Sequence, residues 1–247
     1  MNKPKDFFDR FAEFLKEAEL VKNFIPPIHK TGYPFIILFV IGTILISMIS
    51  DFLGWIGILL TVWCVYFFRD PERTTPKKEN ILVSPADGKI LSISRELVPD
   101  NLSEDKQNEM TKISIFMNVF NVHVNRIPVS GKIVWLKYIP GAFLNASLDK
   151  ASKDNERMIS KIEFNKDAFI YVVQIAGLIA RRIKCELEEN QKVKQGERFG
   201  IIRFGSRVDL YIPDNFRVSV LENQISIAGE TIIAEFDNMI KKNSKLK

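Results

Sequence analysis

Two uncharged apolar runs, separated by one acidic residue, constrain this chain more than any other feature. They cover residues 34 to 50 and 52 to 68, with Asp51 between them. At about 1.5 Å of rise per residue, each run would form a helix of roughly 25 Å, slightly shorter than the hydrocarbon core of a bilayer. Flanking Tyr33 and Arg69 are expected to complete the crossing. The pattern predicts a helical membrane hairpin over 34–68, although runs this short also permit a re-entrant hairpin that never crosses.

Positive charges flank this hairpin on its two outer sides and are absent between the runs. Because cytoplasmic flanks carry an excess of Lys and Arg, both ends are expected to face the cytoplasm, which predicts a cell-membrane protein with its larger part on the cytoplasmic side. A cleaved signal peptide is not expected, since the apolar stretch starts far from the first residue, is too long and lacks a small-residue cleavage site. The flanking cations are Lys16, Lys22 and Lys30 before the hairpin, and Arg69, Arg73, Lys77 and Lys78 after it.

Residues 1 to 33 are predicted to form an amphipathic helix and a linker. Within residues 5 to 23, apolar side chains such as Phe7, Phe11, Phe14 and Ala18 recur at helical spacing. The polar face of this helix mixes acidic and basic residues, so electrostatic attraction to lipid would be weak. Apolar insertion into a membrane, packing on a partner chain and packing on its own domain all stay open.

From residue 69 to 247 the sequence is typical of a β-rich domain. Short runs rich in Ile and Val, many of them alternating with polar residues, are separated by turn residues. We therefore predict a mostly β (α+β) protein, in which a barrel-like or sandwich-like domain follows the amphipathic helix and the hairpin. A polar loop is expected over 99–108 and a short helix within 141–157. The predicted strands are 89–94, 112–117, 122–127, 132–139, 169–175, 179–185, 199–203, 208–212 and 224–227.

Composition excludes several classes of function. The 35 Lys and Arg against 30 Asp and Glu give too small and too dispersed an excess for a nucleic-acid-binding protein. Cys64 and Cys185 form neither a disulfide framework nor a metal-ligand spacing, so we predict two reduced thiols and no metal site.

Histidine is scarce, which sharpens the search for acid-base chemistry. The chain has two histidines, and His is the side chain whose unperturbed pKa lies near neutral pH. His123 falls in a predicted strand, where alternation would place Asn121, His123 and Asn125 on one polar face. A lone buried His is more often structural than catalytic. Asp87-Gly88, taken alone, signals only a tight turn.

A second group of interest lies near the end of the chain, where Gly205 and Ser206 interrupt apolar strand residues. Glycine inside a strand indicates a bulge or a close approach of the backbone to a reactive group. Ser206, His123 and Asp87 could form the triad of a membrane-bound lipid esterase. The Gly-x-Ser-x-Gly nucleophile elbow is absent, however, because Phe204 and Val208 occupy its flanking positions.

A membrane adaptor of biotinyl type is the non-enzymatic alternative. The half-motifs Asp87-Gly88 and Gly196-Glu197 suggest it, but the sequence has no Met-Lys-Met hairpin to carry the modification.

Seven motifs in series resemble the short (type A) form of the phosphatidylserine decarboxylases, from about Tyr33 to Glu235. Each motif alone is weak, whereas their common order is specific. The motifs are Phe67-Phe-Arg-Asp-Pro-Glu-Arg73, Ser84-Pro-Ala-Asp-Gly88, His123-Val-Asn-Arg-Ile-Pro-Val-Ser-Gly131, Phe143-Leu-Asn-Ala-Ser-Leu-Asp-Lys-Ala-Ser152, Asn155-Glu-Arg157, Gly177-Leu-Ile-Ala-Arg-Arg182 and Arg198-Phe-Gly-Ile-Ile-Arg-Phe-Gly-Ser-Arg-Val-Asp209.

The resemblance implies a precursor that cuts itself between Gly205 and Ser206, into a large chain (1–205) and a small chain (206–247) that stay together as a heterodimer. Ser206 would become a pyruvoyl group, the cofactor. That group would form a Schiff base with membrane phosphatidylserine and release phosphatidylethanolamine and CO₂. Ser206, His123 and Asp87 are the implied catalytic residues. A higher oligomer stays open, and no nucleic acid is expected.

One departure from the longer relatives affects the assignment of proton transfers. Those relatives have a second His three residues beyond the first, where this chain has Arg126. His123 would then have to act alone or with Asp87. Arg126 and Arg157 are candidates for binding the lipid phosphate, because a guanidinium matches its oxygens. A surface salt bridge is the plainer interpretation of either arginine.

Overall fold

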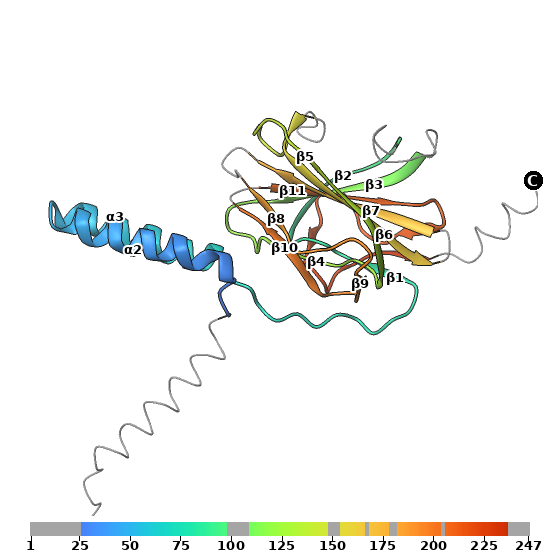
Figure 1. Ribbon diagram of the computed structural model, residues 1–247, viewed down its shortest axis with the longest axis horizontal. Coiled ribbons are helices and arrows are strands. Elements are labelled where there is room, and N and C mark those ends of the chain that lie inside the picture. The colour runs from blue at the N-terminus through green and yellow to red at the C-terminus, as the bar shows by residue number, and fades with distance from the viewer. Residues whose placement is uncertain are drawn as a thin grey trace, which may run out of the picture. The chain divides into compact units, whose positions relative to one another are not determined.

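The computed structural model describes residues 26–97, 109–147, 154–165, 168–177, 182–203 and 206–236. The described residues fall into two compact units, divided between Glu72 and Arg73 (Figure 1). The predicted amphipathic helix of residues 5–23, the loop of residues 99–108 and Phe204-Gly205 lie outside the described residues. So does most of the helix expected within 141–157.

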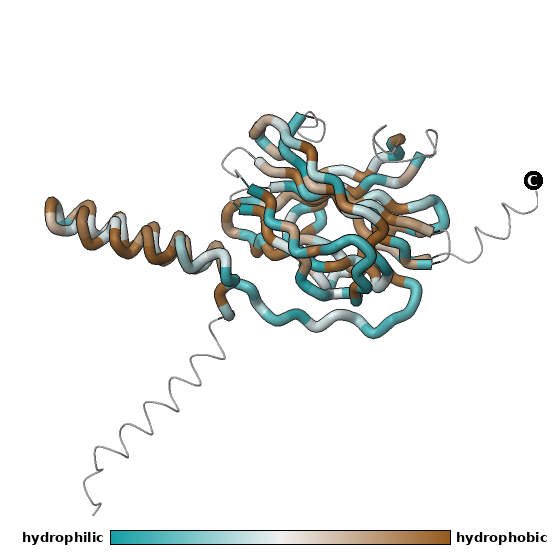
Figure 2. Tube along the Cα trace, viewed as in Figure 1, coloured by the Kyte–Doolittle hydropathy of each residue, from teal (hydrophilic) through white to brown (hydrophobic). Residues whose placement is uncertain are grey.

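The first unit contains the predicted pair of apolar helices. A short 3-10 turn, η1 (Lys30–Gly32), leads into α2 (Tyr33–Ser47), and α3 (Asp51–Phe67) follows. The two helices lie side by side, with the hydroxyl oxygens of Thr43 and Thr61 3.0 Å apart. Most residues of the two helices are hydrophobic (Figure 2), and many of their large apolar side chains are exposed. By length and composition, Lys30–Ser47 could span a membrane, and 6% of this segment is buried.

The second unit consists of three antiparallel sheets, which confirms the predicted mostly β class. The largest has the strand order β13-β2-β3-β11-β7-β6-β5-β9, and the two smaller ones have the orders β1-β14-β12 and β4-β10-β8 (Figure 1). The described strands are β1 (Ile81–Val83), β2 (Gly88–Leu97), β3 (Glu109–Met117), β4 (Val124–Arg126), β5 (Gly131–Ile139), β6 (Arg157–Asn165), β7 (Ala168–Ala176), β8 (Ile183–Cys185), β9 (Lys192–Val193), β10 (Arg198–Ile202), β11 (Ser206–Ile212), β12 (Phe216–Val218), β13 (Ile225–Ser226) and β14 (Ile232–Phe236).

All nine predicted strands overlap a strand in the structure, whereas β1, β6, β9, β12 and β14 were not predicted. Four of these are short. The fifth, β6, pairs with β5 on one side and β7 on the other, although its sequence carries Lys161 and Glu163 among the apolar residues. A strand whose charged side chains are tolerated by its neighbours gives only a weak alternation signal.

Strand β11 lies inside the large sheet and organises it. It pairs with β3 on one side and β7 on the other, and every residue from Ser206 to Ile212 is buried. Val208, Leu210 and Ile212 contribute to the main apolar core. Because β11 is hydrogen-bonded on both edges, a chain cut just before Ser206 would keep this strand in place without a covalent link.

Candidate active site

Ser206 is the first residue of β11 and is fully buried. Its Cα is registered with Met117 at the end of β3 and with Ala176 at the end of β7. The Ser206 Oγ lies 3.9 Å from the Met117 Sδ, a weak acceptor. The predicted nucleophile therefore lies at one end of the large sheet, at the point where three strand ends meet.

Met117 also contacts a buried pair of polar side chains on β4 and β7. The Asn125 Nδ2, on β4, lies 3.7 Å from the same Met117 Sδ that Ser206 contacts. The Asn125 Oδ1 accepts a 2.8 Å hydrogen bond from the Gln174 Nε2 on β7. Met117 thus links β4, which belongs to the sheet β4-β10-β8, to the start of β11. Of these residues, Asn125 was expected on the polar face with His123, and Met117 and Gln174 were not predicted.

His123 lies two residues before Asn125, in the irregular segment between a turn at residues 119–120 and β4, and not in a strand. The predicted strand at residues 122–127 is shorter in the structure, where β4 begins at Val124. Two asparagine side chains stop the extended pairing, because they bond to nearby backbone groups. The Asn118 Oδ1 accepts from the Phe120 N at 2.8 Å, and the Asn121 Oδ1 accepts from the Asn118 N at 2.9 Å.

The turn also orients the imidazole of His123. Its Nδ1 lies 2.9 Å from the backbone oxygen of Asn121, and a carbonyl oxygen can only accept a hydrogen bond. Nδ1 is therefore assigned the proton, which leaves Nε2 as the basic nitrogen. The ring is fully buried. The backbone oxygen of His123 accepts from the Ile202 N at 3.3 Å, so the histidine lies beside the chain segment that leads to Ser206.

Asp87 lies in the turn before β2 and binds two groups. Its Oδ2 accepts a 2.8 Å hydrogen bond from the Arg73 Nη2, and its Oδ1 accepts from the Ala228 N at 2.7 Å. The same turn is tied to β4, because the Pro85 oxygen accepts from the Arg126 N at 2.9 Å. These contacts anchor the turn beside the strand that follows His123. Arg73 is a partner that the sequence did not predict, since it lies 14 positions away in the chain.

The two predicted phosphate-binding arginines differ in their surroundings. Arg126, on β4, is 6% exposed, and its Nη1 donates a 2.9 Å hydrogen bond to the Gly196 oxygen. Arg157, the first residue of β6, is half-buried, and its Nη1 lies 3.4 Å from the Asn155 oxygen. Arg157 shares the end of the large sheet with Ser206, since Arg157 is registered with Ile175 and Ile175 with Arg207.

Asn155 supports this end of the sheet and was singled out only as part of a motif. It is fully buried and binds the Leu144 backbone with both ends of its amide, at 2.9 Å and 2.8 Å. Its Nδ2 also donates to the Ala176 oxygen at 2.7 Å. One side chain thereby holds the loop around Leu144 against the β7 residue that is registered with Ser206.

Behind Ser206, on the opposite face of β11, lies a buried ion pair. The Arg207 Nε is 2.6 Å from the Asp209 Oδ1, and the Arg207 Nη2 donates to the Ser114 Oγ at 2.7 Å. Burial raises the pKa of the Asp209 carboxyl, and the charge of Arg207 opposes that shift. The pair ties β11 to β3 one residue after the predicted cleavage position.

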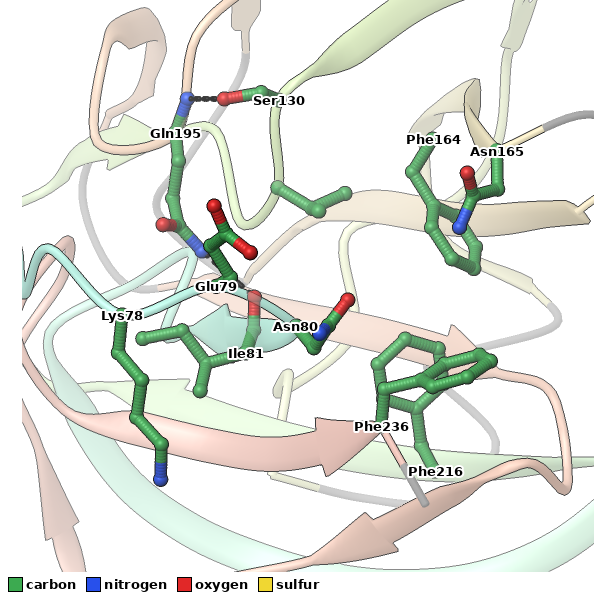
Figure 3. Close-up of a pocket in the computed structure, with 11 residues that line it drawn as sticks. Lys78, Glu79, Asn80, Ile81, Ser130, Phe164, Asn165, Gln195, Phe216 and Phe236 are labelled. Atoms are coloured by element: carbon green, nitrogen blue, oxygen red, sulfur yellow. Dashed lines mark hydrogen bonds between the residues drawn. The ribbon is translucent and has the colours of Figure 1, made fainter. Parts of the chain in front are cut away.

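A separate cavity of about 370 Å³ lies toward the opposite end of β6 from Arg157 (Figure 3). Phe164, Phe216 and Phe236 form an aromatic wall on one side, with ring centroids 5.4 Å apart in each successive pair. Gln195 contributes a polar side chain to the lining, and its Nε2 donates a 2.8 Å hydrogen bond to the Ile81 oxygen. This lining holds neither histidine nor cysteine and therefore offers no acid-base catalyst comparable to His123. Over the described part of the chain, no group of three or more His, Cys, Asp or Glu side chains is placed to hold a metal ion.

Comparison with known proteins supports the resemblance seen in the motifs. The family model for phosphatidylserine decarboxylase matches residues 60–234. A protein of Paramagnetospirillum magneticum named phosphatidylserine decarboxylase proenzyme is 49% identical over 223 residues, which cover 90% of this chain and 92% of the relative. A protein of the same name from Nitrobacter winogradskyi is 51% identical over 219 residues, which cover 89% and 88% of the two chains. The chain therefore belongs to the phosphatidylserine decarboxylase family of enzymes.

Proposed function

We propose that this chain is a proenzyme that cuts itself between Gly205 and Ser206 and then converts phosphatidylserine to phosphatidylethanolamine and CO₂. The observation that carries the proposal is the position of Ser206. It is a buried serine at the exact start of an interior strand, and Met117 links it to the strand that follows His123.

In the precursor, the Ser206 hydroxyl is the nucleophile and the His123 Nε2 accepts its proton. The Ser206 oxygen adds to the Gly205 carbonyl carbon. The peptide C–N bond then breaks, which leaves an ester between Gly205 and the Ser206 oxygen and a free amine on residue 206. Loss of the Ser206 α-hydrogen then expels the Gly205 carboxylate and leaves dehydroalanine. Water adds, ammonia leaves, and residue 206 ends as a ketone. Gly205 suits the attack, because the missing side chain permits a close approach.

The residues around Ser206 fit a pyruvoyl group in its place. Such a group is about as large as serine, so the buried position at the start of β11 can hold it without repacking. When present, it supplies the electron sink that decarboxylation of an amino acid needs. The pairing of β11 with β3 and β7 would keep the backbone carbonyl of residue 206 in register with Met117 and Ala176.

In turnover, His123 has the second proton-transfer role. Its Nδ1 is held by the Asn121 oxygen, so Nε2 is the atom that delivers a proton to the substrate carbon after CO₂ has left. Asp87 and Arg73 fix the turn next to β4 and thereby help to place this histidine. Arg126 and Arg157 are proposed to contribute to binding of the lipid phosphate.

A membrane anchor suits a lipid substrate, because the acyl chains can stay in the bilayer while the headgroup enters the site. The apolar helices α2 and α3 would provide that anchor, with the catalytic unit on the cytoplasmic side according to the flanking cations. After cleavage, the two chains would stay together as a heterodimer through the ladders of β11. The proposed domains are 1–33, 34–68 and 69–247.

Incubation of the purified protein with phosphatidylserine in nonionic detergent micelles tests the proposed activity. We expect phosphatidylethanolamine and CO₂ in equal amounts, and two chains on a denaturing gel. An esterase acting through Ser206, His123 and Asp87 would instead release fatty acid and remain one chain. A biotinyl-like adaptor would do neither, so release of fatty acid or an unaltered lipid would contradict the proposal.

Asp87→Asn is expected to slow self-cleavage at least about tenfold while leaving the fold intact, by analogy with loss of the orienting carboxylate in a catalytic triad. The amide can still accept from the Ala228 N, but it no longer holds the charged Arg73. The measurement is the time course of cleavage after synthesis in a cell-free system. Glu230→Gln is the matched control, because the Glu230 Oε1 accepts from the Thr74 N in the same segment. Equal rates of self-cleavage in both variants would show that Asp87 serves only to form the turn.

A further inference from the structure

Arg182 and Arg203 follow the last registered residues at one end of the β8–β10 pair, and their charges act on each other. Ile183 and Ile202 are opposite each other in the antiparallel register, and the two arginines continue that register by one step. The antiparallel ladder of β8 and β10 holds the two strands together, and they approach so closely that a Cβ at Gly200 would lie 2.3 Å from the Lys184 oxygen. Like charges opposite each other destabilise a strand pair, so stability alone does not explain this arrangement.

A single buried carboxylate accompanies the two arginines. Glu156 is 5% exposed, and its Oε1 accepts a 3.2 Å hydrogen bond from the Ile183 N, next to Arg182. Burial lowers the pKa of Arg203, the positive charge of Arg182 lowers it further, and Glu156 acts in the opposite direction. Two of these three side chains are cations and one is an anion, and Arg182 is exposed to solvent. Two neighbouring guanidinium groups are suited to binding an anion of the substrate.

The group lies beside the candidate catalytic serine. Arg203 precedes Ser206 by three positions, which limits the distance between their Cα atoms to about 11 Å. The backbone of Glu156 also reaches the site, because its oxygen accepts from the Ala176 N at 2.9 Å, and Ala176 is registered with Ser206. A substrate whose amino group reaches residue 206 would place its phosphate, a few bonds away, near these cations.

We propose that the phosphodiester of the substrate binds chiefly to Arg182 and Arg203, with Arg126 and Arg157 as secondary contacts. This inference rests on the proposed function and names the part of the substrate that the cations hold. The substrate's carboxylate is the other candidate anion, but its charge is lost as CO₂ leaves. Cations placed on it would stabilise the ground state more than the transition state and would slow the reaction. The phosphodiester keeps its charge throughout, so binding it does not oppose catalysis.

The proposal predicts a specific kinetic signature. A contact that is equally strong in the ground state and the transition state affects KM and leaves kcat unchanged. We expect Arg203→Gln and Arg182→Gln each to raise KM at least about tenfold, the effect of losing a charge-assisted hydrogen bond. KM and kcat are measured per cleaved chain of each variant, so that a change in the rate of self-cleavage does not enter the comparison. Arg203→Lys, which keeps the charge but not the two-pronged donor, should give an intermediate KM.

Two substrates and one control separate a phosphate subsite from general attraction to an anionic surface. The assay uses water-soluble glycerophosphoserine and, separately, phosphatidylserine in nonionic detergent micelles. Arg217→Gln is the control, since Arg217 is exposed on β12 in the sheet β1-β14-β12. We expect KM to rise with both substrates in the Arg182→Gln and Arg203→Gln variants. In Arg217→Gln, KM should be unchanged with either substrate.

Several results would overturn the subsite. These are a rise in KM restricted to micelles, an equal rise in Arg217→Gln, a fall in kcat at constant KM, or failure of the cleaved Arg203→Lys protein to differ from Arg203→Gln. An active wild type with unchanged variants would reject the subsite alone. A wild type that decarboxylates neither substrate would instead reject the proposed function.

Discussion

The Ser206→Ala protein is expected to remain one folded, inactive chain of 28.4 kDa, whereas the wild type resolves into residues 1–205 and 206–247. The change removes only the nucleophilic oxygen. That oxygen's contact with the Met117 Sδ is long, at 3.9 Å, so the free energy of unfolding should change by no more than about 1 kcal/mol. Denaturing electrophoresis and thermal unfolding measure the two properties separately.

Two further serine variants make this result specific. Ser206→Thr keeps a hydroxyl, so it is expected to cut slowly, but its ketone carries an extra methyl group in a fully buried position. Decarboxylation should therefore be impaired even where cleavage proceeds. Ser160→Ala removes another buried serine hydroxyl, on β6. It should cut normally. Cleavage of Ser206→Ala at Gly205-Ser206 would exclude Ser206 as the nucleophile.

His123→Ala is expected to lower both self-cleavage and turnover by a factor of about 10² to 10⁴, the usual contribution of a general acid or base. No second histidine is available in this unit, because the other one, His29, belongs to the first unit. His123→Gln fills more of the buried space and tests whether a packing defect, and not the lost base, causes the effect.

The control for this experiment is His29→Ala. The His29 Nδ1 lies 2.8 Å from the Thr31 Oγ1, which is a local contact, so cleavage and turnover should stay at wild-type rates. Rates are compared by quantifying uncut chain over time and CO₂ release from the cut fraction. Wild-type cleavage in His123→Gln would show that another group starts the reaction.

Much of the fold could be predicted because its signals are local. The apolar runs that form α2 and α3 are continuous in sequence. In the strand predicted at residues 208–212, Val208, Leu210 and Ile212 recur at every second position, which is a local strand signal. His123 was misplaced in a strand because alternation extends through Val122, whereas the Asn118 and Asn121 side chains close a turn there. Side-chain bonds of this kind compete with strand pairing and leave no periodic signal.

The candidate site was less predictable, because its contacts join distant parts of the chain. Ser206, His123 and Asp87 were chosen from motifs, but their neighbours come from the fold. The hydrogen bond between Gln174 and Asn125 spans 49 positions, and the pairing that brings Arg203 near Arg182 depends on the register of β8 and β10. No property of an isolated segment specifies such a register.

The mass of the small chain shows whether residue 206 becomes a pyruvoyl group. We expect the wild-type fragment 206–247 to be lighter than the serine-initiated peptide by one molecule of ammonia, with no change in the number of oxygen atoms. It should react with hydroxylamine, as a ketone does. It should also resist sequential degradation from its amino end, because a ketone replaces the amine. A fragment with the full mass and a free serine amine, in a preparation that decarboxylates phosphatidylserine at its full rate, would contradict the self-made pyruvoyl group.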